Sequence, residues 1–184
     1  MKAMQGELIT LEPLDITKHA KGYFDVSQDE KIHSYTGNQV PKTVDEIAEL
    51  LKKYEQYFLN WMIISNESHS VIGIIRLSKP EMDNGVLTAG ESQFLASRYW
   101  RKGHMKEAKK LFYRYVFEEL SVEKLYADVW EGNTNSIKSL EFYGYQLEET
   151  REEMFQKTGE YKKKYIYSLS KSNYLSDSNQ LFCK

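Results

Sequence analysis

The residues best suited to bind an anion lie at 99–108. There an apolar run that ends at Leu95 is followed by a basic turn containing Gly103, and a helical pattern of apolar residues comes next. The first N–H groups of a helix lack intrahelical partners, and the helix dipole adds partial positive charge, so such an end binds phosphate readily. The basic side chains of this turn are Arg101, Lys102 and Lys106. The segment therefore predicts a phosphate site, although a solvated loop would have the same composition.

A second polar segment, residues 133–145, follows a strand pattern that ends at Trp130. The crossover from the strand at 87–95 through a helix to the strand at 124–130 should make these strands parallel neighbours. Both polar segments then follow the C-terminal ends of adjacent strands and face one cleft. Open α/β sheets bind ligands at such a position.

The elements that must hold these segments follow from hydrophobic periodicity. Strands are expected at 8–11, 61–64, 71–77, 87–95, 124–130, 145–155 and 162–170. Helices are expected at 16–26, 44–58, 106–120 and 135–143. The pattern predicts an α+β fold with a mixed, mostly antiparallel sheet of about six or seven strands and about four helices.

Several polar and glycine residues mark the ends of these elements. Thr43 with Glu46 forms a capping box, Asn133 or Asn135 can cap the following helix, and Gly144 suits a C-terminus that needs positive φ. Loops are expected at 36–41 and 80–85. We expect one domain over residues 1–176 and a loosely attached or unstructured tail over 177–184.

Composition excludes several classes of function. A net charge of −2 over 184 residues argues against a nucleic-acid or membrane partner. Cys183 is the single cysteine, so no intrachain disulfide is possible, and the four histidines show no metal-ligand spacing. With no signal peptide or membrane span in the pattern, we expect a cytoplasmic protein.

The two polar segments together resemble the GNAT superfamily of N-acetyltransferases. The first is similar to the Arg/Gln-x-x-Gly-x-Gly/Ala turn of that family and runs here from Trp100 to Met105. The second is similar to the Asn-x-x-Ser…Gly-Phe pattern of the subgroup that contains the ribosomal-protein N-terminal acetyltransferases. Its matching positions are Asn133, Ser136, Gly144 and Tyr145. With looser likenesses at both ends, the resemblance covers residues 6–174.

The resemblance implies acetyl-CoA as co-substrate, no metal, and a splayed parallel strand pair at the cofactor site. The pyrophosphate would rest on the turn at 101–106, the pantetheine arm would pair with the backbone at 94–96, and the sulfur would point toward Asn133 and Ser136. The implied cofactor-binding residues are Phe94, Leu95, Ala96, Arg101, Lys102, Gly103, His104, Met105, Lys106, Glu107, Asn133 and Ser136.

The implied reaction is direct attack of a primary amine on the thioester. An N–H near Leu95 is the expected oxyanion donor. Ser136 is the candidate to hydrogen-bond the departing thiolate, unless it only caps its helix. Glu91 is the candidate general base, directly or through water, unless it is a solvent-facing carboxylate at a strand end.

Three residues depart from the family pattern. Met105 replaces a small residue, Leu140 stands where many members carry a catalytic Tyr, and Lys163 stands where many close relatives carry Asp. A GNAT-fold acetyl-CoA-binding protein without efficient turnover is therefore an alternative. The acceptor is a peptide N-terminus or a small-molecule amine, with Tyr35 and His33 in the region where relatives build its pocket. A monomer or a homodimer is expected.

Overall fold

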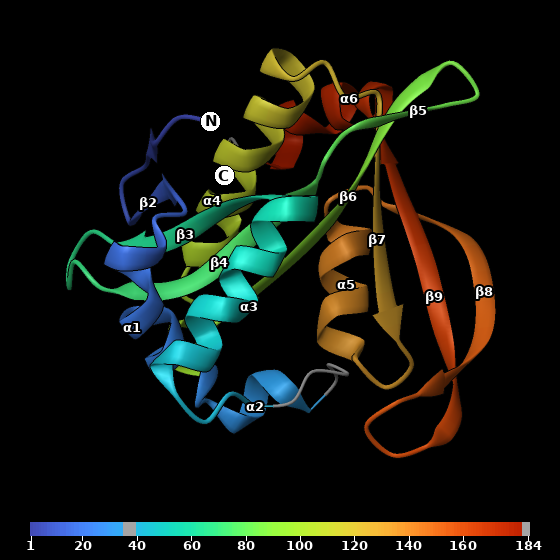
Figure 1. Ribbon diagram of the computed structural model, residues 1–184. Coiled ribbons are helices and arrows are strands. Elements are labelled where there is room, and N and C mark those ends of the chain that lie inside the picture. The colour runs from blue at the N-terminus through green and yellow to red at the C-terminus, as the bar shows by residue number, and fades with distance from the viewer. Residues whose placement is uncertain (35–39, 182–184) are drawn as a thin grey trace.

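A computed structural model describes residues 1–34 and 40–181 (Figure 1). Its strands are β1 (Met4–Gln5), β2 (Ile9–Pro13), β3 (Phe58–Ser65), β4 (Val71–Ser78), β5 (Glu81–Asp83), β6 (Val86–Leu95), β7 (Lys124–Trp130), β8 (Gln146–Phe155) and β9 (Glu160–Ser170). They form one sheet in the order β1-β2-β3-β4-β6-β7-β9-β8, and β5 pairs with β6 outside this path. Only the β6–β7 pairing is parallel among those of the described strands.

Helices cover both faces of the sheet (Figure 1). They are α1 (Ile16–Ser27), α2 (Glu30–His33), α3 (Val44–Tyr57), α4 (His104–Arg114), α5 (Thr134–Phe142) and α6 (Lys171–Leu181). Side chains of α1 and α3 pack on one face, around Met62 and Ile74. The other face carries α4, which continues as a π-helical turn at Tyr115–Glu119, together with residues of α5 and α6.

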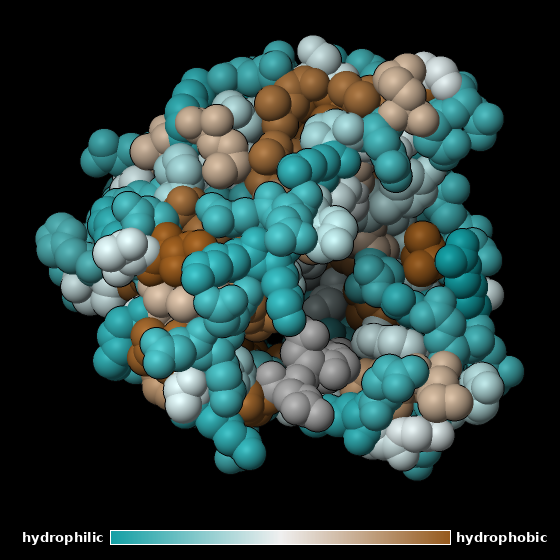
Figure 2. Space-filling view, viewed as in Figure 1, coloured by the Kyte–Doolittle hydropathy of each residue, from teal (hydrophilic) through white to brown (hydrophobic). Residues whose placement is uncertain are grey.

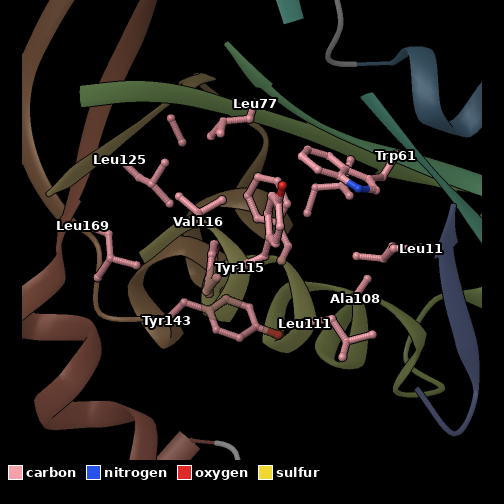
Figure 3. Close-up of a cluster of buried hydrophobic side chains, with 14 of the residues drawn as sticks. Leu11, Trp61, Leu77, Ala108, Leu111, Tyr115, Val116, Leu125, Tyr143 and Leu169 are labelled. Atoms are coloured by element: carbon pink, nitrogen blue, oxygen red, sulfur yellow. The ribbon is translucent and has the colours of Figure 1, made fainter. Parts of the chain in front are cut away.

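The larger core lies between the sheet and α4 (Figure 3). Trp61 and Leu77 from the sheet face Leu111, Tyr115 and their neighbours on the helix (Figure 3). The Trp61 ring meets the Tyr115 ring edge-on, with centroids 5.5 Å apart. Because aromatic side chains bury large apolar areas, this packing holds α4 firmly against the strands that precede it.

The parallel pair separates soon after it forms. Only three residues of β6, Thr88–Gly90, pair with three of β7, Lys124–Tyr126. Beyond Gly90, β6 stays with β4 as far as Leu95, while β7 stays with β9 as far as Trp130. The two strands therefore diverge into a wedge, as the family resemblance predicted.

The fold class predicted from the sequence is confirmed, with differences at the periphery. The described chain has nine strands and six helices, more than expected. The loop predicted at 80–85 contains β5, which forms a hairpin with β6 through Asn84 and Gly85 at positive φ. The tail expected from residue 177, unstructured or loosely attached, is helical as far as Leu181, where α6 ends, and how loosely it is attached stays a prediction. Tyr35, Cys183 and most of the loop predicted at 36–41 lie outside the described residues.

Candidate active site

The N-terminus of α4 has the backbone expected of an anion site. Gly103 precedes the helix with φ +86°, and Arg101 also has a positive φ of 60°. The N–H of Glu107 donates to the Gly103 carbonyl at 3.0 Å and begins the helical ladder. The N–H groups of residues 104–106 precede that ladder, in the position where helices bind anions. Gly103 is suited to this turn because a side chain at positive φ is strained.

The ring of His104 packs edge-on against Tyr99, with centroids 5.1 Å apart. Its Nδ1 is buried without a hydrogen-bond partner among the described residues. Met105 is half-buried and packs against the larger core, so its longer side chain points into the protein. The predicted roles of both residues in binding the cofactor stay predictions.

Glu107 binds the N-terminal segment of the chain. Its carboxylate accepts hydrogen bonds from the N–H groups of Glu7, Leu8 and Ile9 at 2.8, 2.8 and 2.9 Å. A Cβ added at Gly6 would lie 2.5 Å from Glu107 Cδ, so that glycine is needed for the close approach. Both the side chain and the N–H of Glu107 thus have protein partners, and its assignment as a cofactor-binding residue stays untested.

The edge of β6 that faces the wedge is partly occupied. Ala96 donates its N–H to the Ile72 carbonyl at 2.8 Å, on the side of β4. Because successive residues of a strand direct their backbone groups to opposite edges, the N–H of Leu95 points toward the wedge. The Leu95 carbonyl accepts a bond of 2.6 Å from the indole Nε1 of Trp100. This geometry suits the Leu95 N–H for the predicted oxyanion contact.

Asn133, of the two candidates, caps α5. Its side-chain oxygen accepts a hydrogen bond from the N–H of Ser136 at 3.3 Å. Ser136 therefore lies in the first turn of the helix instead of at its cap, and it is half-buried. Leu140 is buried in the larger core, which gives this position a packing role. Gly144 has φ +82°, as predicted for the residue that ends the helix.

Glu91 has a different environment from the one its candidate role requires. Its side chain is fully buried and its Oε1 lies 3.1 Å from the Nζ of Lys109, which is also fully buried. The hydroxyl of Tyr113 donates to the same oxygen at 3.2 Å, while Oε2 has no partner among the described residues. The carboxylate therefore points into the core beneath α4, and its role as a general base stays a prediction.

Three tyrosine rings surround the Lys109 ammonium, and sequence reasoning missed this group. Nζ lies 5.5, 4.8 and 5.8 Å from the ring centroids of Tyr113, Tyr143 and Tyr145. Burial foremost, and then the nearby Glu91 charge, raises the pKa of all three hydroxyls above its usual range. One feature of the sequence could have indicated it: Lys109 lies within the apolar stripe of a helix, where an unpaired charge is costly.

A cleft of about 340 Å³ lies where the two strands of the wedge begin to separate. It is on the α3 side of the sheet, since Phe58, which follows α3, lines it together with Ser92 of β6. Glu91 of β6 is part of its lining, although the carboxylate points to the other face of the sheet. The other charged lining residues come from β7, β8 and β9 and are Asp128, Arg151, Glu153 and Lys164. The volume is within the usual range for a small-molecule site. Figure 2 shows a recess near the centre of this face, between the positions of α3 and α5 in Figure 1.

Two predicted neighbours of the acceptor lie outside this arrangement. The ring of His33 is buried, with Nε2 2.6 Å from the Ser27 carbonyl. The Lys163 carbonyl accepts from the Glu131 N–H at 2.9 Å, and the Lys163 N–H donates to the side-chain Oε1 of Glu131 at 3.1 Å. The exposed Lys163 side chain lies on the opposite face of β9 from Lys164. Among the residues that the structure describes, no group of three His, Cys, Asp or Glu side chains could hold a metal ion.

Comparison with known proteins shows the family of the chain. The family model described as an acetyltransferase (GNAT) domain matches residues 9–146. The probable N-acetyltransferase YjcK of Bacillus subtilis (strain 168) is 28% identical over 156 residues, which cover 79% of this chain and 84% of the relative. The chain therefore belongs to the GNAT acetyltransferase family.

Solved structures of the same fold were also found. A GCN5-related N-acetyltransferase from Brucella melitensis superposes with a TM-score of 0.82 at 24% identity, covering 98% of this chain and 85% of that one. A spermidine N-acetyltransferase from Vibrio cholerae, in complex with CoA and spermine, has a TM-score of 0.77 at 21% identity, covering 92% and 99%. At these identities the likeness shows the fold alone. The described residues contain no helix long and apolar enough to cross a membrane.

Proposed function

We propose that this protein transfers an acetyl group from acetyl-CoA to a primary amine by direct attack on the thioester. The observation that carries this proposal is the wedge between β6 and β7, which opens beside the N-terminus of α4. An extended pantetheine arm can add to an unpaired strand edge, as peptides do in β-augmentation. The positive end of the helix, with Arg101 and Lys102 beside it, suits the pyrophosphate.

The residues present fit acetyl-CoA in two respects. The space beside Gly103 is open, since a Cβ there would meet only the flexible end of Leu8, at 3.2 Å, and the backbone of this turn can approach an anion closely. The N–H groups of His104 and Met105 lie ahead of the helical ladder, in the position where helix ends bind anions. When bound, acetyl-CoA supplies the activated acetyl group. We propose as cofactor-binding residues all those that the family resemblance implies. Glu107 contributes indirectly, because its carboxylate anchors the N-terminal segment to α4.

The chain's own residues have distinct tasks in this proposal. The Leu95 N–H stabilises negative charge on the thioester oxygen, a contribution that is worth about 10²–10³-fold in enzymes with such a donor. Ser136 hydrogen-bonds the departing sulfur from the first turn of α5. Replacing Ser136 by Ala should lower kcat with little change in acetyl-CoA affinity, and unchanged turnover would remove Ser136 from the chemistry.

Glu91 can serve as general base only if protons reach its Oε2, the oxygen that no described group contacts. The full burial of the carboxylate and its bond to Lys109 instead favour a positioning role for Glu91. The pH dependence of kcat in the Glu91→Gln variant separates these roles. If Glu91 is the general base, Glu91→Gln should remove the acidic limb of the pH profile. If Glu91 is a positioning residue, the variant should have a lower kcat at all pH values.

Direct binding and turnover measurements test the proposal. Acetyl-CoA should raise the melting temperature, because a ligand that binds only the native state stabilises it. Free thiol should then appear when primary amines are added. No thermal shift at millimolar acetyl-CoA would overturn the proposal. Binding without thiol release across an amine panel would favour the second candidate, a GNAT protein without turnover, which the buried Leu140 makes a specific alternative.

We further propose that the acceptor is a peptide N-terminus or a small-molecule amine. The segment from Asn133 to Tyr145 supports the subgroup of ribosomal-protein N-terminal acetyltransferases. Because the only cysteine is Cys183, we place the protein in the cytoplasm. It acts there as a monomer or homodimer.

A further inference from the structure

The ammonium of Lys164 lies between two carboxylates that line the cleft. Its Nζ lies 3.0 Å from Oδ2 of Asp128 on β7 and 3.4 Å from Oε2 of Glu153 on β8. It also lies 5.2 Å from the centroid of the Trp130 ring. The side chain is 22% exposed, so the ammonium is held between its partners instead of extending into solvent.

Asp128 and Glu153 form an acidic pair, and the other charged residues of the cleft are bound to partners of their own. Arg151 makes a two-pronged pair with Glu149, at 2.7 Å from both Nε and Nη2. The Glu91 carboxylate is on the opposite face of β6, where Lys109 neutralises it. Asp128 and Glu153 are therefore the carboxylates that could bind an ammonium entering the cleft, and Lys164 already bridges them.

We propose that Lys164 is an internal counter-cation that makes the acceptor cleft select monoamines over polyamines. The inference rests on the function proposed above, since it concerns the acceptor of the same site. A polyamine needs carboxylates for each additional ammonium, and here such a group would have to displace a tethered lysine. A tethered ammonium competes at high effective concentration, so the displacement is unfavourable.

Lys164 remains charged over the working pH range. Burial lowers the pKa of its ammonium, but the hydrogen bond to Asp128, its charge and that of Glu153 outweigh burial and raise the pKa above its usual value. At neutral pH its positive charge therefore offsets one of the two carboxylate charges beside it. It is also unsuited to accept a proton from the acceptor.

The rest of the lining suits an apolar acceptor body. Phe58, Tyr126 and Ile166 line the cleft from three different strands. An aromatic or aliphatic group packed against them would place a single amine toward the wedge. The acceptor class that follows is a primary monoamine on an uncharged, largely apolar body.

Binding of two probe amines tests this inference. Phenethylamine carries one charge on an apolar body, and spermidine is a trication. Isothermal titration calorimetry in the presence of CoA should show tighter binding of phenethylamine than of spermidine to the wild type. In Lys164→Met, spermidine should bind at least about tenfold more tightly, because the acidic pair is released. Phenethylamine should change by less than about threefold.

Two further variants control the experiment. Lys163→Met removes the same charge from the adjacent position on the opposite face of β9, and it should leave both affinities unchanged. Adding Asp128→Asn to Lys164→Met should remove most of the gain for spermidine. Melting temperatures close to the wild type show that each variant is folded.

The results that would overturn this inference differ from those that would overturn the proposed function. Tighter binding of spermidine than of phenethylamine by the wild type would overturn the inference. So would equal spermidine affinities of Lys164→Met and Lys163→Met, or no binding of either amine to either protein. Acetyl-CoA binding, followed separately by thermal shift, decides the proposed function itself, and these amine affinities need no turnover to be measured.

Discussion

The ammonium of Lys109 on α4 lies 3.1 Å from the carboxylate of Glu91 on β6, and both side chains are fully buried. Glu91 directly follows Gly90, the last residue of β6 that pairs with β7. The ion pair therefore joins the helix that begins at the anion site to the strand that borders the wedge. We therefore predict that this contact helps to set how the wedge opens.

Removing one partner of this pair should be strongly destabilising. Lys109→Met leaves the Glu91 charge buried without its counter-ion, and such losses cost about 3–5 kcal/mol. The double variant Lys109→Met/Glu91→Leu should recover much of that loss, because no charge remains buried. Urea denaturation measures the free energies of unfolding. Lys53→Met, at an exposed position of α3, is the control and should change stability by less than about 0.5 kcal/mol.

The same pair should matter for acetyl-CoA beyond stability. If it sets the wedge, a double variant with recovered stability should still bind acetyl-CoA more weakly than the wild type, with a raised KM. Recovered stability together with unchanged KM would show that the pair serves the core alone.

Gly103 and Gly159 offer a matched test of the anion site. Both have positive φ, +86° and +72°, so alanine should cost each of them about 1 kcal/mol of stability. Only Gly103 lies at the start of α4, and its alanine variant should also bind acetyl-CoA at least about tenfold more weakly, a loss of about 1.4 kcal/mol. Equal acetyl-CoA affinities in the two variants would contradict the assignment of the turn.

Glu107→Ala tests the anchor between the N-terminal segment and α4. Three backbone N–H groups lose a charged acceptor, and hydrogen bonds to charged groups contribute about 1.5–3 kcal/mol each at most. Since water can reach part of this exposed segment, we expect a net loss of about 2 kcal/mol. Hydrogen exchange at residues 7–9 should accelerate more than the global change predicts. Unaltered exchange there would mean that strand pairing alone holds the segment.

The sequence predicted best those features that local chemistry determines. The Thr43 cap, whose hydroxyl accepts from Glu46 N–H at 3.1 Å, and the positive φ of Gly144 follow from residues a few positions apart. The parallel strand pair was predicted from the order of elements, and its divergence into a wedge from the family resemblance. All these predictions depend on patterns that can be read along the sequence.

The missed features depend on contacts between distant positions. Glu91 and Lys109 are 18 residues apart, and the depth at which they meet depends on how α4 packs on the sheet. The cleft combines side chains of five strands, so no local pattern marks Lys164 as the partner of Asp128. β5 was missed because it has three exposed residues, and α6 because its sequence is mostly polar.

Acid should destabilise the protein in part through Asp29. This carboxylate caps α2 and accepts the Ser97 N–H at 2.6 Å, which ties the α1–α2 connection to the end of β6. Burial opposes ionisation, but the hydrogen bonds from Ser97 and Lys31 outweigh it and lower the pKa of Asp29. A carboxyl group with a lower pKa in the folded state stabilises it above the unfolded pKa, near pH 4, and loses that contribution as the pH falls.

Asp29→Asn should therefore have a smaller decrease in melting temperature between pH 6 and about pH 3 than the wild type. Asparagine can still cap the helix, so its stability at acidic pH should approach that of the wild type. Asp25→Asn, at an exposed position of α1, is the control and should follow the wild-type curve more closely. If both variants retain the full acid dependence, the hydrogen bonds from Ser97 and Lys31 contribute no pH-dependent stability, and the link between α2 and β6 rests on packing alone.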